Sequence, residues 1–207
     1  MPVQLEKLVF YLEQKGILKS ENIARALGAV DRIDFVPEDL KELAYEDDPL
    51  PLGYEQTISQ PHTVVFMLEI LDVKVGQKIM DIGYGSGWQS ALLANLVGEK
   101  GKIYAFEIVP QLCQIGKDNV KKYKELYHRV KFFCQNAKHG YEKESPFDRI
   151  IVAATLSKVP QEWRRQLKVG GKIVYPLHNS IYLEEKTSDK LFIKKEYPDF
   201  VFVPFVS

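Results

Sequence analysis

Apolar positions recur at helical spacing over the first part of the chain. Leu5, Leu8 and Leu12 fall on one face of a predicted helix that ends at Gly16, and a second predicted helix runs over 21–30. The two helices are expected to form a cap on the part of the chain that follows.

From residue 61 onward, apolar helical patterns alternate with short apolar runs typical of buried strands. This alternation predicts a doubly wound (Rossmann-like), mostly parallel sheet with helices on both faces. Segments 180–189 and 190–205 instead alternate apolar and charged residues with no helix between them, so they predict an antiparallel C-terminal edge pair. The predicted helices are 61–72, 87–97, 110–124 and 161–167, and the predicted strands are 78–82, 102–107, 130–134, 149–154 and 170–177.

The segment 31–60 follows neither pattern. Pro49, Pro51 and Gly53 exclude a continuous helix, and the apolar and aromatic content argues against disorder. A loop of this length within an α/β fold is usually functional. We therefore expect one domain over 1–207, with 1–60 as helical cap and substrate loop, and 61–207 as cofactor-binding sheet and C-terminal strands.

Charge and composition exclude several classes of protein. The 28 basic and 28 acidic residues cancel, so no domain-wide field attracts nucleic acid or an anionic membrane. No apolar run approaches the roughly 18 residues of a membrane span, and the first residues do not resemble a secretion signal. We expect a cytoplasmic protein without a metal site, and Cys113 and Cys134 are expected to be reduced core thiols.

A glycine-rich turn, "DIGYGSGW", joins the first sheet strand to the next helix. Asp81, Gly83, Gly85 and Gly87 belong to this turn, and glycines there let the backbone turn sharply and approach a ligand. Trp88 stands where a dinucleotide-binding fold needs a small residue. The turn therefore favours S-adenosylmethionine over NAD, and a plain tight turn is the alternative.

Two polar residues at later strand ends extend this candidate site. Glu107 ends the next strand, 24 residues after Gly83, and is placed to accept from both ribose hydroxyls. Asn136 follows the third strand and is placed to accept from the adenine amino group. The alternatives are an exposed strand-end acid for Glu107 and a turn residue for Asn136.

Several stretches together resemble the protein-L-isoaspartate (D-aspartate) O-methyltransferase family. They are "PLPLGYEQTISQP" before a helix, "DIGYGSG", "PFD" before the fourth strand, "VPQEWRRQLKVGGKIVYP", and the terminal "FVFVPF". The glycine motif is shared by many methyltransferases, whereas "TISQPH" is particular to this family.

The resemblance implies methyl transfer from S-adenosylmethionine to the α-carboxylate of isoaspartyl residues in damaged proteins, with S-adenosylhomocysteine as product. The methyl ester would then close to a succinimide that reopens to aspartate, which repairs the protein. The implied fold is of the S-adenosylmethionine-dependent methyltransferase type. The neutral charge and the exposed edge pair leave a monomer or weak dimer open, and we expect the protein to bind neither nucleic acid nor membranes. The residues implied are Ser59 as the active-site residue, Gln56, Thr57 and His62 at the substrate, and Ile58, Tyr84, Ile108 and Ala137 as further cofactor contacts.

The sequence departs from the family pattern in two motifs. Gln135-Asn136-Ala137 replaces the usual Gly-Asp-Gly, and Tyr84 replaces a small residue. These departures keep two alternatives open: a related carboxyl methyltransferase for a different peptide, and a cofactor-binding homologue with weak or no activity.

Overall fold

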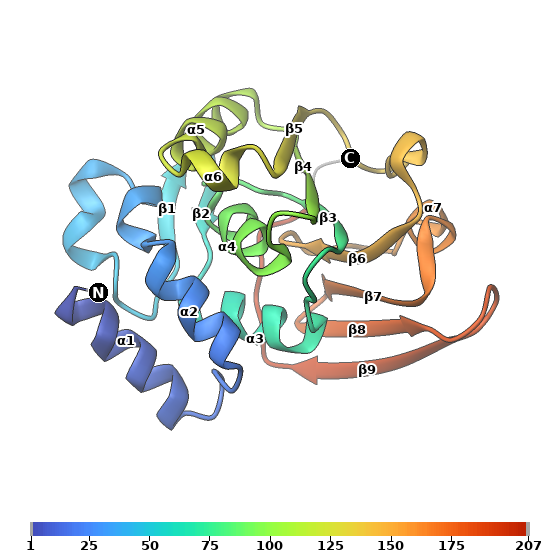
Figure 1. Ribbon diagram of the computed structural model, residues 1–207, viewed down its shortest axis with the longest axis horizontal. Coiled ribbons are helices and arrows are strands. Elements are labelled where there is room, and N and C mark those ends of the chain that lie inside the picture. The colour runs from blue at the N-terminus through green and yellow to red at the C-terminus, as the bar shows by residue number, and fades with distance from the viewer. Residues whose placement is uncertain (1, 206–207) are drawn as a thin grey trace.

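The computed structural model describes residues 2–205 as one large mixed sheet flanked by helices (Figure 1). The strand order is β5-β4-β3-β6-β7-β8-β9, in which β5 through β7 are parallel and β8 and β9 are antiparallel to their neighbours. The chain builds β3, β4 and β5 outward and then returns to β6 on the other side of β3. The predicted doubly wound sheet and its antiparallel edge are confirmed.

The elements agree closely with the sequence pattern after residue 61. The helices are α1 (Val3–Gln14), α2 (Glu21–Ala29), α3 (Pro61–Leu71), α4 (Trp88–Val97), α5 (Pro110–Lys121), α6 (Lys124–Tyr127) and α7 (Gln161–Arg165). The strands are β1 (Leu50–Gly53), β2 (Gln56–Ile58), β3 (Lys78–Ile82), β4 (Lys102–Glu107), β5 (Val130–Cys134), β6 (Phe147–Val152), β7 (Leu167–Leu177), β8 (Ser180–Lys186) and β9 (Phe192–Pro198). Within residues 2–205, no helix is long and apolar enough to cross a membrane.

Alternating side chains of the central strands divide the core between the two faces of the sheet. Ile79 and Ile103 face the layer of α1 to α6, whereas Met80 and Tyr104 face the layer that contains α7. The two-residue period of a strand explains this division, because successive side chains point to opposite faces. Both faces of the parallel strands are therefore covered, as a doubly wound sheet requires.

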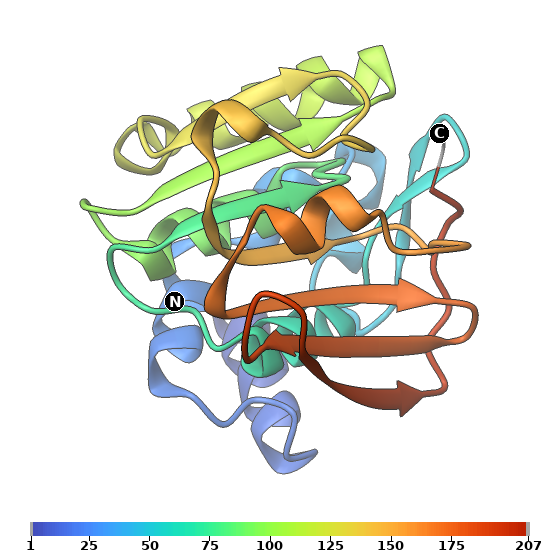
Figure 2. The same ribbon diagram turned by 90° about the vertical axis from the view of Figure 1, so that its right-hand side faces the viewer.

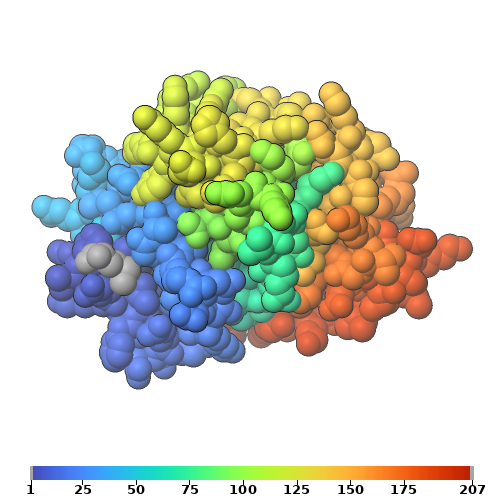
Figure 3. All heavy atoms as spheres, in the orientation of Figure 1, coloured from blue at the N-terminus to red at the C-terminus, as the bar shows by residue number. Residues whose placement is uncertain are grey.

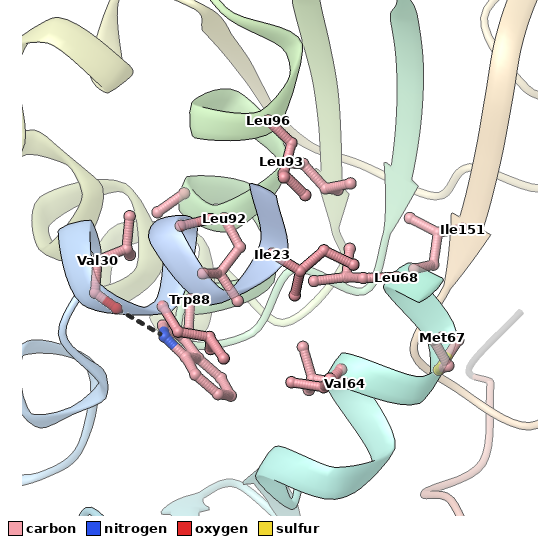
Figure 4. Packing of buried hydrophobic residues seen from close by; sticks show 14 of the residues in the cluster. Ile23, Val30, Val64, Met67, Leu68, Trp88, Leu92, Leu93, Leu96 and Ile151 are labelled. Carbon is pink, nitrogen blue, oxygen red and sulfur yellow. Dashed lines mark hydrogen bonds between the residues drawn. The ribbon is translucent and has the colours of Figure 1, made fainter. Parts of the chain in front are cut away.

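Helix α2 packs on α3 and α4, and α1 packs on α2. Figure 4 shows Ile23 of α2 facing Leu92 of α4 and Leu68 of α3. The indole N–H of Trp88 donates to the carbonyl of Val30 at 3.3 Å, which fixes the end of α2 against the start of α4. Figure 3 shows the blue atoms of this segment adjoining the green and yellow atoms of the following part.

The segment 31–60 contains a hairpin that the sequence pattern did not predict. Strands β1 and β2 pair antiparallel and are joined by Tyr54 and Glu55, both at positive φ (54° and 58°). Two such residues define the turn that suits a two-residue hairpin. The usual Asn-Gly signal for this turn is absent, which is why the hairpin was missed.

The predicted final edge strand is only partly correct. Strand β9 ends at Pro198, and the chain then turns across the carboxyl ends of the parallel strands toward the β1–β2 hairpin (Figure 2). Thr155 holds the last part, since its N–H donates to the carbonyl of Val203 at 2.8 Å and its carbonyl accepts from Phe205 at 2.9 Å. The alternating apolar residues of 190–205 thus pair first with β8 and then with Thr155. Their two-residue period alone does not reveal this change of partner.

The two cysteines form a disulfide, so the prediction of reduced core thiols is wrong. Cys113 lies in α5 and Cys134 at the end of β5, and their Cα atoms are 5.6 Å apart. The spacing of 21 residues gave no sign of this, because the approach arises only when α5 packs beside β5. Cys134 is exposed, whereas Cys113 is buried.

Removing this disulfide is expected to lower the free energy of unfolding by about 3 kcal/mol, the value typical of a loop of this length. Urea unfolding of the Cys113→Ser/Cys134→Ser variant measures the loss. Dithiothreitol should destabilise the wild type by a similar amount and leave the variant unchanged. A wild-type midpoint that is insensitive to the reductant would contradict the expectation.

Candidate active site

A cavity opens at the carboxyl ends of β3, β4 and β6, where the strand order reverses. It holds about 850 Å³ of space, part of it open to solvent. This is the position at which doubly wound sheets bind ligands. The glycine turn, the β2 segment and the C-terminal tail all contribute to its lining.

The glycine turn forms a tight elbow between β3 and α4. Gly83, Gly85 and Gly87 all adopt positive φ, at 83°, 47° and 87°. At Gly87 a side chain would also collide with α5, since an added Cβ would lie 2.5 Å from the carbonyl oxygen of Gly116. Gly83 and Gly85 line the cavity, whereas Gly87 lies behind it and allows the close approach of α5.

The carboxylate of Glu107 ties the elbow to the end of β4. One oxygen accepts from the N–H of Gly85 at 3.0 Å, and the other accepts from Ile108 at 2.7 Å and Val109 at 3.0 Å. Glu107 is only 8% exposed and lines the cavity. A carboxylate has about four lone-pair sites, so acceptor capacity remains for a ligand hydroxyl.

Asp81 does not line the cavity but lies beneath it. Its carboxylate is fully buried and accepts from the side chains of Gln89 and Ser90, and Gln89 lines the cavity. Burial raises the pKa of Asp81 to about 6, against the lowering effect of the two hydrogen bonds, and the charge of Glu107 raises it further.

This raised pKa predicts a pH-dependent contribution to stability. Between the unfolded value of 3.8 and about 6, the folded protein binds more protons at Asp81 than the unfolded chain, so stability falls as pH rises through this window. Asp81→Asn removes the dependence. Comparing the free energies of unfolding from pH 4 to pH 7 should show the wild type losing on the order of 3 kcal/mol relative to the variant. Parallel curves would contradict the assignment.

Tyr84, one of the departures from the family pattern, is turned toward α5. Its hydroxyl donates to the carbonyl of Cys113 at 3.0 Å, and its ring packs edge-on against Phe132. Burial raises the pKa of Tyr84 well above its usual value, so the phenol stays neutral. Only 3% of the residue is exposed. Its ring packs beside Gly116, and the residue also borders the cavity.

The loop after β5 brings Asn136 and Ala137 to the cavity. The side-chain oxygen of Asn136 accepts from the N–H of Lys138 at 2.7 Å, which makes it the first residue of a local turn. Ala137 is buried, and its carbonyl accepts from the indole N–H of Trp163 at 2.7 Å. Asn136 thus borders the cavity from this loop, with its side-chain oxygen engaged in the local turn.

The segment around β2 lines the opposite side of the cavity with Gln56, Thr57, Ile58 and Ser59. Ser59 is half-buried and directly precedes the residue that caps α3. The chain therefore brings the "TIS" segment and the glycine elbow into one cavity, although Ile58 and Asp81 are 23 positions apart.

His62 lies outside the cavity lining. Its main-chain N–H donates to the carboxylate of Asp47 at 2.7 Å. Its imidazole ring packs edge-on against the ring of Phe200, with centroids 6.2 Å apart. These contacts order the start of α3. The assignment of His62 to the substrate stays a prediction, as do the roles assigned to the residues that line the cavity.

Several lining residues were not identified from the sequence. The tail contributes Val203, Pro204 and Phe205, and the end of β6 leads to Ala153 and Ala154. Small apolar residues after a strand carry no distinctive signal. The tail is held at the site by its pairing with Thr155, which no local pattern encodes.

The lining fits S-adenosylmethionine in the donor and acceptor groups it presents. Glycines at the elbow leave backbone close to the cavity, Glu107 offers an acceptor to ribose hydroxyls, and apolar side chains such as Ile108 and Leu112 suit an adenine ring. Cys, His and acidic side chains do not cluster as metal ligands anywhere in residues 2–205.

The sheet order, the glycine elbow and the acidic end of β4 define an α/β protein of the S-adenosylmethionine-dependent methyltransferase class. Residues 3–207 match the family described as protein-L-isoaspartate(D-aspartate) O-methyltransferase. The chain belongs to this family.

Named relatives agree with this placement. A protein-L-isoaspartate O-methyltransferase of Methanopyrus kandleri is 40% identical over 97% of this chain and 90% of its own, and one of Ignicoccus hospitalis is 37% identical over 100% and 99%. A Plasmodium falciparum protein assigned to the same family, solved in complex with S-adenosyl-L-homocysteine, superposes with a TM-score of 0.86. It is 26% identical, and the match covers 96% of each chain.

Proposed function

We propose that this protein is a protein-L-isoaspartate O-methyltransferase that methylates the α-carboxylate of isoaspartyl residues in damaged proteins. One observation carries the proposal: Ser59 and the glycine elbow line the same cavity at the carboxyl edge of the sheet. The family membership and the relatives' names support the same reaction.

The cofactor part of the cavity accounts for one half of this function. When bound, S-adenosylmethionine supplies an activated methyl group. Glu107 is proposed to accept from the ribose hydroxyls, Gly83 and Gly85 to admit the cofactor close to the backbone, and Asn136 and Ala137 to border the adenine ring.

Ser59 accounts for the other half. The substrate carboxylate, with a reference pKa near 4, is ionised at neutral pH, so no residue has to remove a proton. The site has to align the substrate carboxylate with the methyl group. The hydroxyl of Ser59 donates one hydrogen bond to the carboxylate and directs its other oxygen toward the methyl group, and a neutral donor holds the substrate less tightly than Lys or Arg would.

The wider cellular setting follows as part of the proposal. The protein is proposed to be a cytoplasmic monomer or weak dimer that acts on polypeptides. The neutral net charge gives no field that would favour nucleic acid or an anionic membrane as its partner. The cap and the sheet are proposed to work as one methyltransferase domain. Size-exclusion chromatography with light scattering measures the state, and a stable tetramer would contradict it.

The reaction is tested with methyl-labelled S-adenosylmethionine and two peptides of one sequence, one with isoaspartate and one with aspartate. Label should enter only the isoaspartyl peptide, and slow release of volatile methanol should follow as the ester closes to a succinimide. Transfer to neither peptide, with cofactor binding by calorimetry, would overturn the proposal and favour a binding protein or a different acceptor.

A further inference from the structure

Arg32, in the segment after α2, does not line the cavity but reaches the main chain of Ser59, which does. Its side chain is fully buried, and it donates to four main-chain carbonyls in two segments, 44–48 and Ser59. One terminal nitrogen donates to Ala44 at 2.7 Å and to Glu46 at 3.3 Å, and the other donates to Asp48 at 3.0 Å and to Ser59 at 3.2 Å. The same guanidinium therefore links the turn before β1 to the carbonyl of Ser59.

The guanidinium also contacts the cofactor side. Its central carbon lies 5.5 Å from the centre of the Trp88 ring, within the range of a cation–π contact. Trp88 is the first residue of α4 and directly follows the glycine elbow. The carbonyl of Val30 holds Trp88 in place. Arg32 therefore connects the fixed Trp88 ring to the main chain of Ser59.

The charge of Arg32 is retained in this buried place. Burial lowers the pKa of Arg32 to about 10, and the charges of Asp47 and Asp48 act in the opposite direction. The group stays protonated at neutral pH. Its Nε is buried and lacks a hydrogen-bond partner among the described residues, so the terminal nitrogens carry the hydrogen bonds described above.

We propose that Arg32 is a positioning residue for methyl transfer. It fixes the position of Ser59 relative to the glycine elbow, because its guanidinium binds the Ser59 carbonyl and also packs on the Trp88 ring. This inference rests on the proposed function. Pro61 restrains the chain after Ser59 because a residue before proline favours extended backbone, and the pairing of Ile58 with Leu50 restrains the chain before it. Arg32 supplies the remaining restraint, at Ser59 itself.

Arg32→Lys tests the inference, because lysine keeps the charge but lacks the planar fork that reaches several carbonyls together. We expect kcat to fall roughly tenfold, the effect of one lost hydrogen bond to a charged donor. The KM for the isoaspartyl peptide should rise, and the cofactor Kd should change less than about twofold, since no cofactor-lining group is removed.

The chain offers a matched control in Arg149. This arginine is also buried, at 7% exposed, and donates to the carbonyls of Leu71, Asp72 and Asp148, but at the start of β6, away from the cavity. Arg149→Lys should lower stability without changing kcat or KM at temperatures at which it is folded.

Amide hydrogen exchange supplies a readout that does not need the isoaspartyl reaction. Exchange over residues 56–60 should speed up in Arg32→Lys and stay unchanged in Arg149→Lys. If the wild type methylates no isoaspartyl peptide, the proposed function fails, and this exchange pattern still decides whether Arg32 holds Ser59. Unchanged kinetics and exchange in folded Arg32→Lys would overturn the inference. So would the failure of both Arg32→Lys and Arg32→Gln to fold, since it would make Arg32 a core residue.

Discussion

Replacing Ser59 with alanine is expected to lower kcat for the isoaspartyl peptide roughly 10- to 100-fold, the value of one hydrogen bond to a charged acceptor. The reason is alignment, because the carboxylate keeps its charge but loses the donor that directs it. The cofactor Kd should stay within about twofold, since the Ser59 hydroxyl is proposed to bind the substrate and not the cofactor. Single-turnover kinetics and calorimetry measure the two quantities separately.

Glu107→Gln provides the opposite pattern. The substitution turns one carboxylate oxygen of Glu107 into an amide NH₂ group, which donates instead of accepting. This group then faces either the N–H of Gly85 or the N–H groups of Ile108 and Val109. The cofactor Kd should rise by one to two orders of magnitude, with a smaller fall in kcat at saturating cofactor. Equal changes in cofactor affinity for both variants would contradict the division between the two sides of the cavity.

Replacing Gly87 with alanine is expected to destabilise the fold by about 2 to 5 kcal/mol, the sum of a left-handed backbone cost and an overpacking cost. The added methyl would lie 2.5 Å from the Gly116 carbonyl oxygen and 2.8 Å from the side chain of Val120. Backbone atoms cannot move aside as the end of a flexible side chain can, so α5 would have to shift away from the elbow. Urea unfolding measures the loss, which is a large part of the roughly 5–15 kcal/mol of a typical domain.

Gly170→Ala is the matched control for this prediction. Gly170 has a similar φ of 79°, but nothing lies within 4 Å of an added Cβ. It should therefore show only the backbone cost of about 1–2 kcal/mol. Equal losses in the two variants would show that the approach of α5 to the elbow contributes nothing.

Most of the sheet could be predicted from the sequence because its strands are local and strongly patterned. The runs "KIMDI" and "KIYAFE" became β3 and β4 with the predicted bounds. The parallel, doubly wound pairing followed from the alternation with helices and the right-handed crossover rule. The N-terminal cap followed from helical spacing and a turn near Gly16.

The features that were missed depend on contacts between distant segments. The disulfide requires α5 to lie beside β5, the hairpin turn uses Tyr54 and Glu55 in a conformation that their residue types rarely adopt, and the C-terminal tail changes partners after β9. No local period distinguishes these outcomes from the alternatives. Sequence reasoning therefore placed the elements better than the connections between them.

The candidate site was predicted more completely where a motif fixes the backbone. Gly83, Gly85 and Glu107 lie at the cavity, as their position at strand ends implied. Asp81 and Gly87 lie beneath and behind it, because the same motif also has to hold the elbow against α4 and α5. Arg32 had no sequence signal as a site residue, since its link to Ser59 spans 27 positions.

The central claim is that the Ser59 hydroxyl faces the transferred methyl group across one cavity. A crystal structure with S-adenosylhomocysteine and an isoaspartyl peptide tests it most directly. The account predicts that the peptide α-carboxylate accepts a hydrogen bond from Ser59 Oγ and points its other oxygen at the sulfur atom. A carboxylate bound by other residues, with Ser59 Oγ turned away from it, would contradict the account.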